Sequence, residues 1–206
     1  MQTENVQLNE CEVWLLVLAA GFSKRMGEQK LLLSVKGETM IRYVVKKLNQ
    51  TKADGIIVVT NSCFEKEKYE LADLGIVILE NDESHLGMSS SLKLGIQYLK
   101  KRNAGSAIIL LADQPTIDVQ IINRVIDKYK KDRFDIIQAL YQTKPSHPVL
   151  FSKRWFDELL QISGDKGARD VMKMNQNQIM FVECDVPEPK DIDTVKDYED
   201  LIKSIA

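Results

Sequence analysis

Runs of apolar residues recur along the chain and alternate with amphipathic stretches. The runs contain few polar residues, which is typical of strands that are covered on both faces in a parallel sheet. They lie at residues 13–18, 56–60, 76–79, 108–111 and 135–140. Between most of them, apolar residues recur every three or four positions, as in helices with one buried face. This alternation predicts an α/β fold with three α/β/α layers around a Rossmann-like, mostly parallel sheet.

The remaining stretches are less regular. A more polar helix is expected over 65–73, with its Lys- and Glu-rich start facing solvent. After residue 141 we expect a loop entering a strand over 144–151, short helices near 155–160 and 167–175, a strand over 179–182 and a final helix from 195. No repeat, low-complexity segment or long linker divides the 206 residues. The prediction is therefore a single domain over residues 1–206, with a loose tail over 1–11.

The residues that follow the first apolar run favour anion binding. Positions 19–21 are Ala-Ala-Gly, small residues that let backbone N–H groups approach a ligand closely. Three cations, Lys24, Arg25 and Lys30, then supply positive charge. The spacing fits neither a P-loop nor the dinucleotide fingerprint Gly-x-Gly-x-x-Gly. The sequence therefore predicts a polyphosphate site of another kind at the end of a buried strand.

Polar residues also follow other predicted strands, and ligands of such sheets bind at the carboxyl ends of the strands. Asp113 follows the run 108–111, and is either a ligand of a hard cation such as Mg²⁺ or a helix cap. Asp191 and Asp193 precede the final helix, where a cap is the simpler interpretation and a second Mg²⁺ carboxylate is the alternative. Residues 87–92 contain three serines, more than one cap needs, so we favour an added ligand role there.

Composition and charge exclude several classes of protein. The net charge is −2, so nothing global attracts nucleic acid or an anionic membrane. No apolar run reaches the roughly 18 residues that cross a bilayer, and the first residues do not resemble a signal peptide. Three scattered cysteines form no disulfide framework, which indicates a reducing cytoplasm. Two histidines argue against a Cys/His zinc site.

Five sequence segments together resemble the nucleotidyltransferases of the MobA/MocA type. They are LAAGFSKRMGEQKLLL, GMSSSLKLGI, LLADQP, HPVLF with GDKGAR, and DIDTVKDY, and the resemblance extends from about residue 14 to 198. The first segment alone indicates a broad superfamily, whereas the combination is much more specific. The sequence of the first segment, LAAGFSKRMGEQK, is most similar to the molybdenum cofactor cytidylyltransferase branch.

The resemblance implies a role for each matched position. The implied nucleotide-binding residues are Leu18, Ala19, Ala20, Gly21, Arg25, Lys30, Asn81, Gly87 and Ser91. The implied catalytic residues are Arg25, Lys30 and Asp113, and the implied Mg²⁺ ligands are Asp113 and Asp193. The phosphorylated pterin acceptor would contact His147, Asp165 and Arg169. Ala20, in place of a glycine, resembles the CTP-using branch.

The activity implied is transfer of CMP from CTP to molybdenum-bound molybdopterin, giving the cytosine dinucleotide cofactor and pyrophosphate. One alternative is a GTP-using guanylyltransferase of the same family. Another is a non-catalytic carrier that delivers the cofactor to a molybdoenzyme of the xanthine dehydrogenase type. Retention of Arg25, Lys30 and Asp113 favours the enzyme over the carrier.

Overall fold

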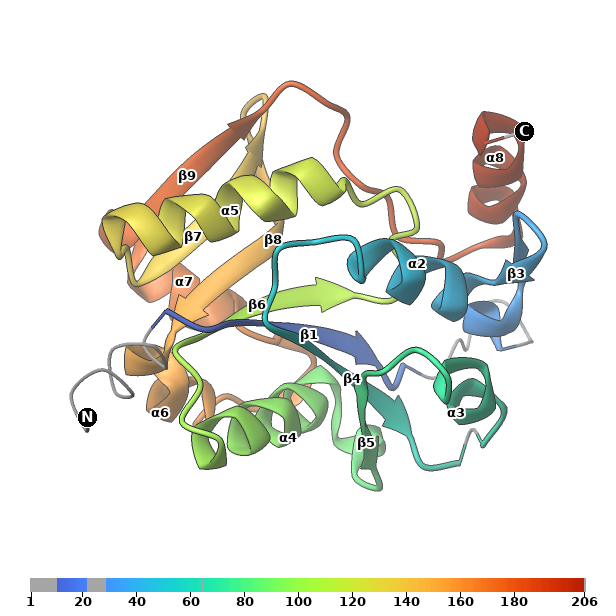
Figure 1. The fold of residues 1–206 in the computed structure, drawn as a ribbon, viewed down its shortest axis with the longest axis horizontal. Coiled ribbons are helices and arrows are strands. Elements are labelled where there is room, and N and C mark those ends of the chain that lie inside the picture. The colour runs from blue at the N-terminus through green and yellow to red at the C-terminus, as the bar shows by residue number, and fades with distance from the viewer. Residues whose placement is uncertain (1–10, 22–28, 64, 206) are drawn as a thin grey trace.

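The computed structural model describes residues 11–21, 29–63 and 65–205, and its centre is a sheet of seven strands. The strands are β1 (Val13–Ala19), β4 (Gly55–Asn61), β5 (Val77–Asn81), β6 (Ser106–Leu111), β7 (Ile136–Tyr141), β8 (Lys144–Ser152) and β9 (Ile179–Cys184). Their order across the sheet is β5-β4-β1-β6-β8-β7-β9 (Figure 1). Only β8 runs antiparallel to its neighbours, which confirms the predicted mostly parallel sheet.

Helices cover both faces of this sheet, as the three-layer prediction requires (Figure 1). One face packs against α2 (Met40–Leu48), α3 (Glu65–Leu71), α5 (Val119–Asp132) and α8 (Val195–Ile205). The other packs against α4 (Met88–Lys101), α6 (Phe156–Leu159) and α7 (Arg169–Met174). The described residues also include the short 3₁₀ helices η1 (Lys30–Leu32), η2 (Ser84–Leu86), η3 (Lys153–Trp155), η4 (Gly164–Lys166) and η5 (Gln176–Gln178).

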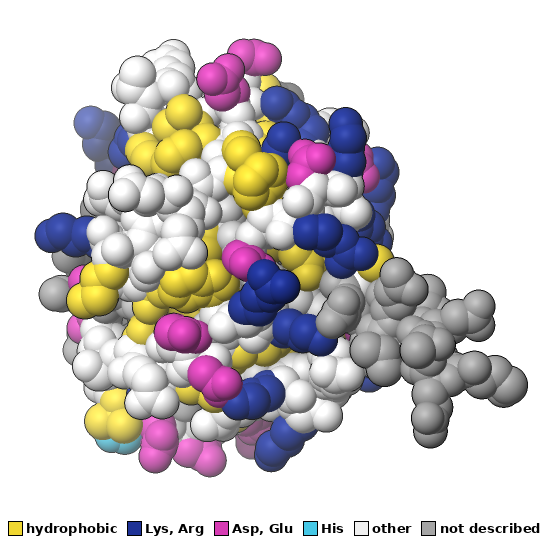
Figure 2. Space-filling model, turned by 90° about the vertical axis from the view of Figure 1, so that its left-hand side faces the viewer, with side chains coloured by type: hydrophobic (Ala, Val, Ile, Leu, Met, Phe, Trp, Pro, Cys, Tyr) yellow, Lys and Arg dark blue, Asp and Glu magenta, His cyan; other side chains and the backbone are white. Residues whose placement is uncertain are grey.

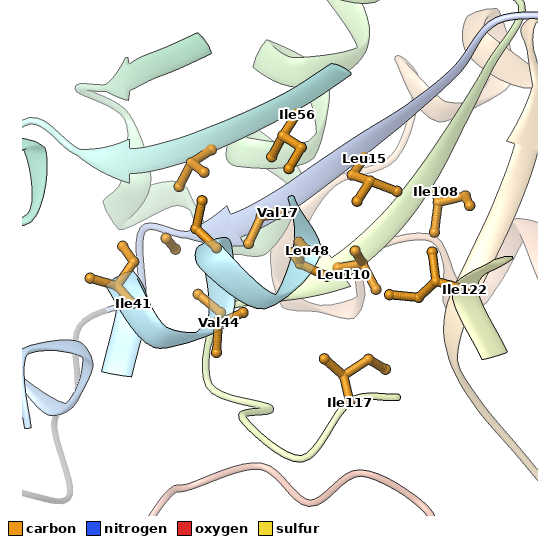
Figure 3. Close-up of a cluster of buried hydrophobic side chains, with 14 of the residues drawn as sticks. Leu15, Val17, Ile41, Val44, Leu48, Ile56, Ile108, Leu110, Ile117 and Ile122 are labelled. Atoms are coloured by element: carbon orange, nitrogen blue, oxygen red, sulfur yellow. The ribbon is translucent and has the colours of Figure 1, made fainter. Parts of the chain in front are cut away.

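The apolar run of β1 divides between two cores because successive side chains of a strand point to opposite faces. Leu15 and Val17 lie in the core under α2 and α5, shown in Figure 3, whereas Leu16 packs on the α4 side. These side chains are fully buried, and each such burial contributes about 1.5–3 kcal/mol. Gly95 of α4 lets that helix approach β1, since a Cβ there would lie 2.2 Å from Cδ1 of Leu16.

Three sequence expectations about local structure were wrong or incomplete. The stretch 144–151, expected as a loop that enters a strand, is strand throughout as part of β8, and its first three residues pair with β7. A two-stranded hairpin, β2 (Ser34–Val35) with β3 (Glu38–Thr39), was not predicted. Glu67, expected on a solvent face, is 2% exposed because α3 turns this residue inward. Residues 1–10 of the expected tail lie outside the described residues.

The parallel strands all end on one side of the molecule, and this positions the site. Figure 2 shows the opposite side, where β1 begins. Acidic and basic side chains intermingle among the described residues of that face, so it is not uniformly basic. Within the described part of the chain, no helix is long and apolar enough to span a membrane.

Candidate functional site

A cavity of about 750 Å³ lies where β1 and β6 end, beside the N-terminus of α4. Seven of the predicted nucleotide-binding residues line it: Leu18, Ala19, Ala20, Gly21, Lys30, Gly87 and Ser91. The predicted cation ligands, Asp113 and Asp193, line it as well. Arg25, which was predicted to be catalytic, lies outside the described residues. Residues from distant parts of the sequence therefore share one cavity at the carboxyl ends of the strands, as such sheets favour.

Lys30 joins the two predicted metal ligands at this cavity. Its Nζ donates to Oδ2 of Asp113 at 2.6 Å and to Oδ1 of Asp193 at 2.9 Å. Burial by itself would lower the pKa of Lys30, but the two carboxylates outweigh burial and raise it. The ammonium is therefore positively charged at neutral pH and neutralises part of the acidic cluster.

The structure shows which side chains cap the two helices, and the Mg²⁺ role of Asp113 and Asp193 stays a prediction. Asp118, not Asp113, caps α5 by accepting from the N–H of Gln120 at 2.7 Å. At α8, Thr194 is the cap: its Oγ1 accepts from the N–H of Asp197, whose Oδ2 accepts from the N–H of Thr194 at 2.8 Å. The carboxylates of both predicted metal ligands, Asp113 and Asp193, accept hydrogen bonds from Lys30.

The C-terminal segment is tied to the end of β6 by backbone and side-chain bonds. The N–H of Ile192 donates to the carbonyl oxygen of Asp113 at 3.0 Å. Nε2 of the buried Gln114 donates to Oδ1 of Asp191 at 2.7 Å, while Oε1 of Gln114 is buried without a partner. Asp191, whose role stayed open on sequence alone, lines the cavity beside the other two carboxylates.

The N-terminus of α4 is closed by a glycine and by a carboxylate from a distant loop. The serines were expected to cap this helix, but the N-cap residue is Gly87. Glycine has no side chain that could accept a hydrogen bond from the backbone N–H groups of the first turn. Oδ1 of Asp165 instead accepts from the N–H of Met88 at 3.3 Å. Asp165, predicted to bind the acceptor, therefore also holds η4 against α4.

Asn81 lies behind the cavity wall and does not line the cavity. It is buried, and its Nδ2 donates to the hydroxyls of Ser90 and Ser91 at 2.8 Å each. Its Oδ1 accepts from the N–H of Glu83 at 2.9 Å. The side chain thus orients Ser91, which lines the cavity, while its predicted direct contact with nucleotide stays a prediction.

His147 and Arg169 also lie outside the cavity lining, unlike Asp165. His147 belongs to β8 rather than to a loop, and its Nδ1 is 3.2 Å from the carbonyl oxygen of Ile109. Burial lowers the pKa of His147, so its neutral form is favoured. Arg169 is the exposed first residue of α7, with its charge close enough to lower the pKa of His147 further.

Sequence reasoning missed six residues of the cavity wall. Three are apolar, Leu31, Leu111 and Ala112, and the other three are Ser84, His85 and Met88. Ser84 and His85 come from η2, a short helix that no periodicity signals. Their position two and three residues before the recognised Gly87 was the available signal. With Met88, they add a hydroxyl, an imidazole and a thioether to the cavity wall.

The carboxylates of Asp113 and Asp193 fit Mg²⁺, although the described residues do not form a metal site with three or more protein ligands. Among the described residues, no group of three or more His, Cys, Asp or Glu side chains is arranged to hold a metal. Mg²⁺, however, is commonly held by only one or two carboxylates plus waters and substrate phosphates. Asp113 and Asp193 provide two carboxylates that already converge on one cation, the Lys30 ammonium.

Comparisons with known proteins agree with this geometry. A model of the MobA-like NTP transferase domain matches residues 15–179. Purine catabolism protein PucB of Bacillus subtilis is 28% identical over 191 residues, which cover 88% of this chain and 92% of PucB. A probable molybdenum cofactor guanylyltransferase of Natranaerobius thermophilus is 30% identical over 122 residues, covering 59% of this chain and 57% of that protein.

Solved structures share the whole fold. Rv0371c from Mycobacterium tuberculosis H37Rv superposes with a TM-score of 0.83 and 26% identity, covering 93% of this chain and 98% of that chain. The structure of Rv0371c in complex with manganese gives a TM-score of 0.80 and 25% identity, covering 94% and 99%. These likenesses confirm the predicted fold class.

Proposed function

The chain belongs to the MobA-like NTP transferase domain family, and we propose that it transfers CMP from CTP to molybdenum-bound molybdopterin, with Mg²⁺ as cofactor. The observation that carries the proposal is the meeting of Lys30, Asp113 and Asp193 at a cavity walled by the small residues 19–21. Positive charge, a cation site and accessible backbone N–H groups are what a nucleoside triphosphate requires.

In the proposed reaction, the terminal phosphate of the acceptor attacks the α-phosphorus of CTP in line. A P–O bond to the α-phosphorus forms, the bond to the bridging oxygen breaks, and pyrophosphate leaves. A phosphate monoester is already an anion at neutral pH, since its second pKa is about 6, so no general base is needed. The protein therefore contributes positioning and charge neutralisation.

Each group of the site has a defined task. Lys30 offers its ammonium to the phosphates, and residues 19–21 offer backbone N–H groups without steric obstruction. Asp113 and Asp193 would hold Mg²⁺, whose bound charge would offset the charge of the triphosphate. A structure of Rv0371c is a complex with manganese, and the similarity extends over nearly its full length, which supports a divalent cation as cofactor.

The choice of acceptor and nucleotide rests on the relatives and on one residue. A relative named as a probable molybdenum cofactor guanylyltransferase supports a molybdenum cofactor acceptor and makes GTP the second candidate nucleotide. CTP is favoured by Ala20, which lines the cavity and stands where the guanylyltransferase branch has glycine.

Thermal unfolding with CTP, GTP, ATP or UTP, each with Mg²⁺, tests the nucleotide. Ligand at 100-fold over Kd adds about 2.7 kcal/mol of stability. For a chain of this size that raises the Tm by about 5–11 °C. CTP should give the largest shift. A larger shift with GTP would support the guanylyltransferase, and stabilisation by the pterin cofactor without any nucleotide consumption would support the carrier.

Pyrophosphate release in the presence of the acceptor tests the catalytic residues. Lys30→Ala and Asp113→Ala should each slow the reaction by about 10²–10³, as expected when a group that stabilises transition-state charge is lost. The matched control is Lys131→Ala, which removes an exposed lysine of α5 and should leave the rate unchanged. Wild-type turnover in Lys30→Ala or Asp113→Ala would refute the assignment.

A further inference from the structure

Lys30 occupies the position that a metal ion shared by Asp113 and Asp193 would take. Its ammonium is within hydrogen-bonding distance of both carboxylates, at 2.6 and 2.9 Å. The side chains of Lys30 and Asp113 are 12% and 20% exposed and that of Asp193 is 47% exposed, so the ammonium is largely shielded while one carboxylate faces solvent. The two carboxylates come from segments 80 residues apart, and Lys30 bridges them at their point of approach.

A divalent cation and this ammonium compete for the same oxygens. Two cations within contact distance repel strongly, and the repulsion is greater in a partly buried site than in water. Mg²⁺ or Mn²⁺ therefore cannot take both carboxylates unless Lys30 moves away. A triphosphate bound in the cavity would offer the displaced ammonium a new anionic partner.

We propose that Lys30 is a built-in counter-ion of the empty site, which makes the binding of metal and nucleotide cooperative. Without nucleotide, Lys30 holds Asp113 and Asp193 together and suppresses metal binding. When the triphosphate enters, Lys30 transfers to phosphate and the carboxylates become available to the metal. By linkage, the factor by which nucleotide tightens metal binding equals the factor by which metal tightens nucleotide binding. This inference rests on the proposed function, since it assumes a divalent cation at these two carboxylates.

The test is a titration of the full chain with Mn²⁺ alone, with free Mn²⁺ read by electron paramagnetic resonance. Lys30→Met removes the competing charge at similar side-chain length, and should bind Mn²⁺ at least tenfold more tightly than the wild type. Lys30→Arg keeps the positive charge and should bind Mn²⁺ as weakly as the wild type. Lys131→Met is the matched control on α5 and should also match the wild type. Equal or weaker Mn²⁺ binding by Lys30→Met overturns the inference.

A second measurement needs no substitution, in case Lys30→Met does not fold. Acylation of lysines in the wild-type chain, read by peptide mass spectrometry, reports whether an ammonium is held in an ion pair. Saturating Mn²⁺ should increase acylation of Lys30 and leave Lys131 unchanged. Absence of any increase at Lys30 overturns the inference. Neither experiment uses the acceptor. If the wild-type chain transfers nucleotide but Lys30→Met binds Mn²⁺ no more tightly than the wild type, the counter-ion role is refuted and the proposed function stands.

Discussion

Replacing Gly87 by alanine should destabilise the protein by about 4 kcal/mol, because two independent costs add at this residue. Gly87 has φ +96° and ψ 179°, a region occupied almost only by glycine, where another residue costs about 1–3 kcal/mol. The added Cβ would also lie 2.3 Å from Oδ1 of Asp165 and 2.8 and 2.9 Å from backbone atoms of Gly164. The carboxylate can rotate away, but the Gly164 backbone cannot move without shifting η4.

The size of the effect follows from these contacts. Crowding of this kind typically costs another 1–3 kcal/mol, so the sum is about 2–6 kcal/mol. In a chain of this size each kcal/mol lowers the Tm by about 2–4 °C, so a loss of about 4 kcal/mol lowers it by about 8–16 °C. The displaced η4 should also widen the cavity at Asp165, because that residue both lines the cavity and closes the α4 terminus.

Urea unfolding of the variant and of one control measures the two costs separately. Gly75→Ala is the control, since Gly75 has φ +67° but nothing lies within 4 Å of an added Cβ. It should lose only about 1–2 kcal/mol from the left-handed backbone. Asp165→Ala in the Gly87→Ala background should recover only the side-chain part of the crowding. If Gly87→Ala loses no more stability than Gly75→Ala, the proposed contact between α4 and η4 is wrong.

Two further predictions concern buried polar groups. Burial raises the pKa of Glu67 from its ordinary 4.5 to about 8. Between these two pH values the native chain holds a proton that the unfolded chain has lost, so the free energy of unfolding falls as pH rises. Glu67→Gln should therefore be more stable than the wild type at pH 8.5 and similar to it near pH 4.5, by urea unfolding; a constant difference across pH would contradict this. Gln114→Leu should change unfolding free energy by less than about 1 kcal/mol, because the lost bond to Asp191 is offset by removal of the unpaired Oε1.

The fold was predictable for the strands whose residues are apolar because both faces of the strand are buried. The runs that became β1, β4 and β6 are covered on both faces, so nearly every position had to be apolar. The first half of β8 could not be recognised in this way. It carries two prolines, which remove backbone donors and are usual in loops, and it is held at the sheet by pairing with β7 over 139–141. The register shift between Gln138 and Ala139 accommodates this irregular strand.

Glu67 shows the limit of composition as a guide to exposure. Its neighbours Glu65 and Lys68 are charged, and a run of charges normally marks a solvent face. Which residue of a short helix turns inward depends on how the helix lies on α2 and the sheet, and that is fixed by tertiary contacts. The same dependence on long-range contacts explains Asn81, which follows a strand as a ligand residue would but is satisfied by Ser90 and Ser91.

The site itself was predictable only in part, for a topological reason. The end of a buried strand is recognisable, so Lys30 and Asp113 could be placed near one another from the sequence pattern. Asp193 could be assigned only through resemblance, because nothing local distinguishes it from the cap residue Thr194. The structure separates them by their partners: Thr194 bonds with Asp197, and Asp193 reaches Lys30.

Besides the bond between Gln114 and Asp191, three contacts from different parts of the chain hold the C-terminal segment at the ends of the strands. The Ile192 N–H bonds to the Asp113 carbonyl, and Oη of Tyr198 donates to the carbonyl oxygen of Ser34 at 2.6 Å. Lys30 supplies the third contact through Asp193, and it is the only one of the three that a bound nucleotide would compete for. The two backbone-directed bonds can therefore keep Asp193 beside Asp113 when Lys30 turns to phosphate. Lys30 can therefore pair with the carboxylates before nucleotide binds and with phosphate afterwards, while Asp193 keeps its place.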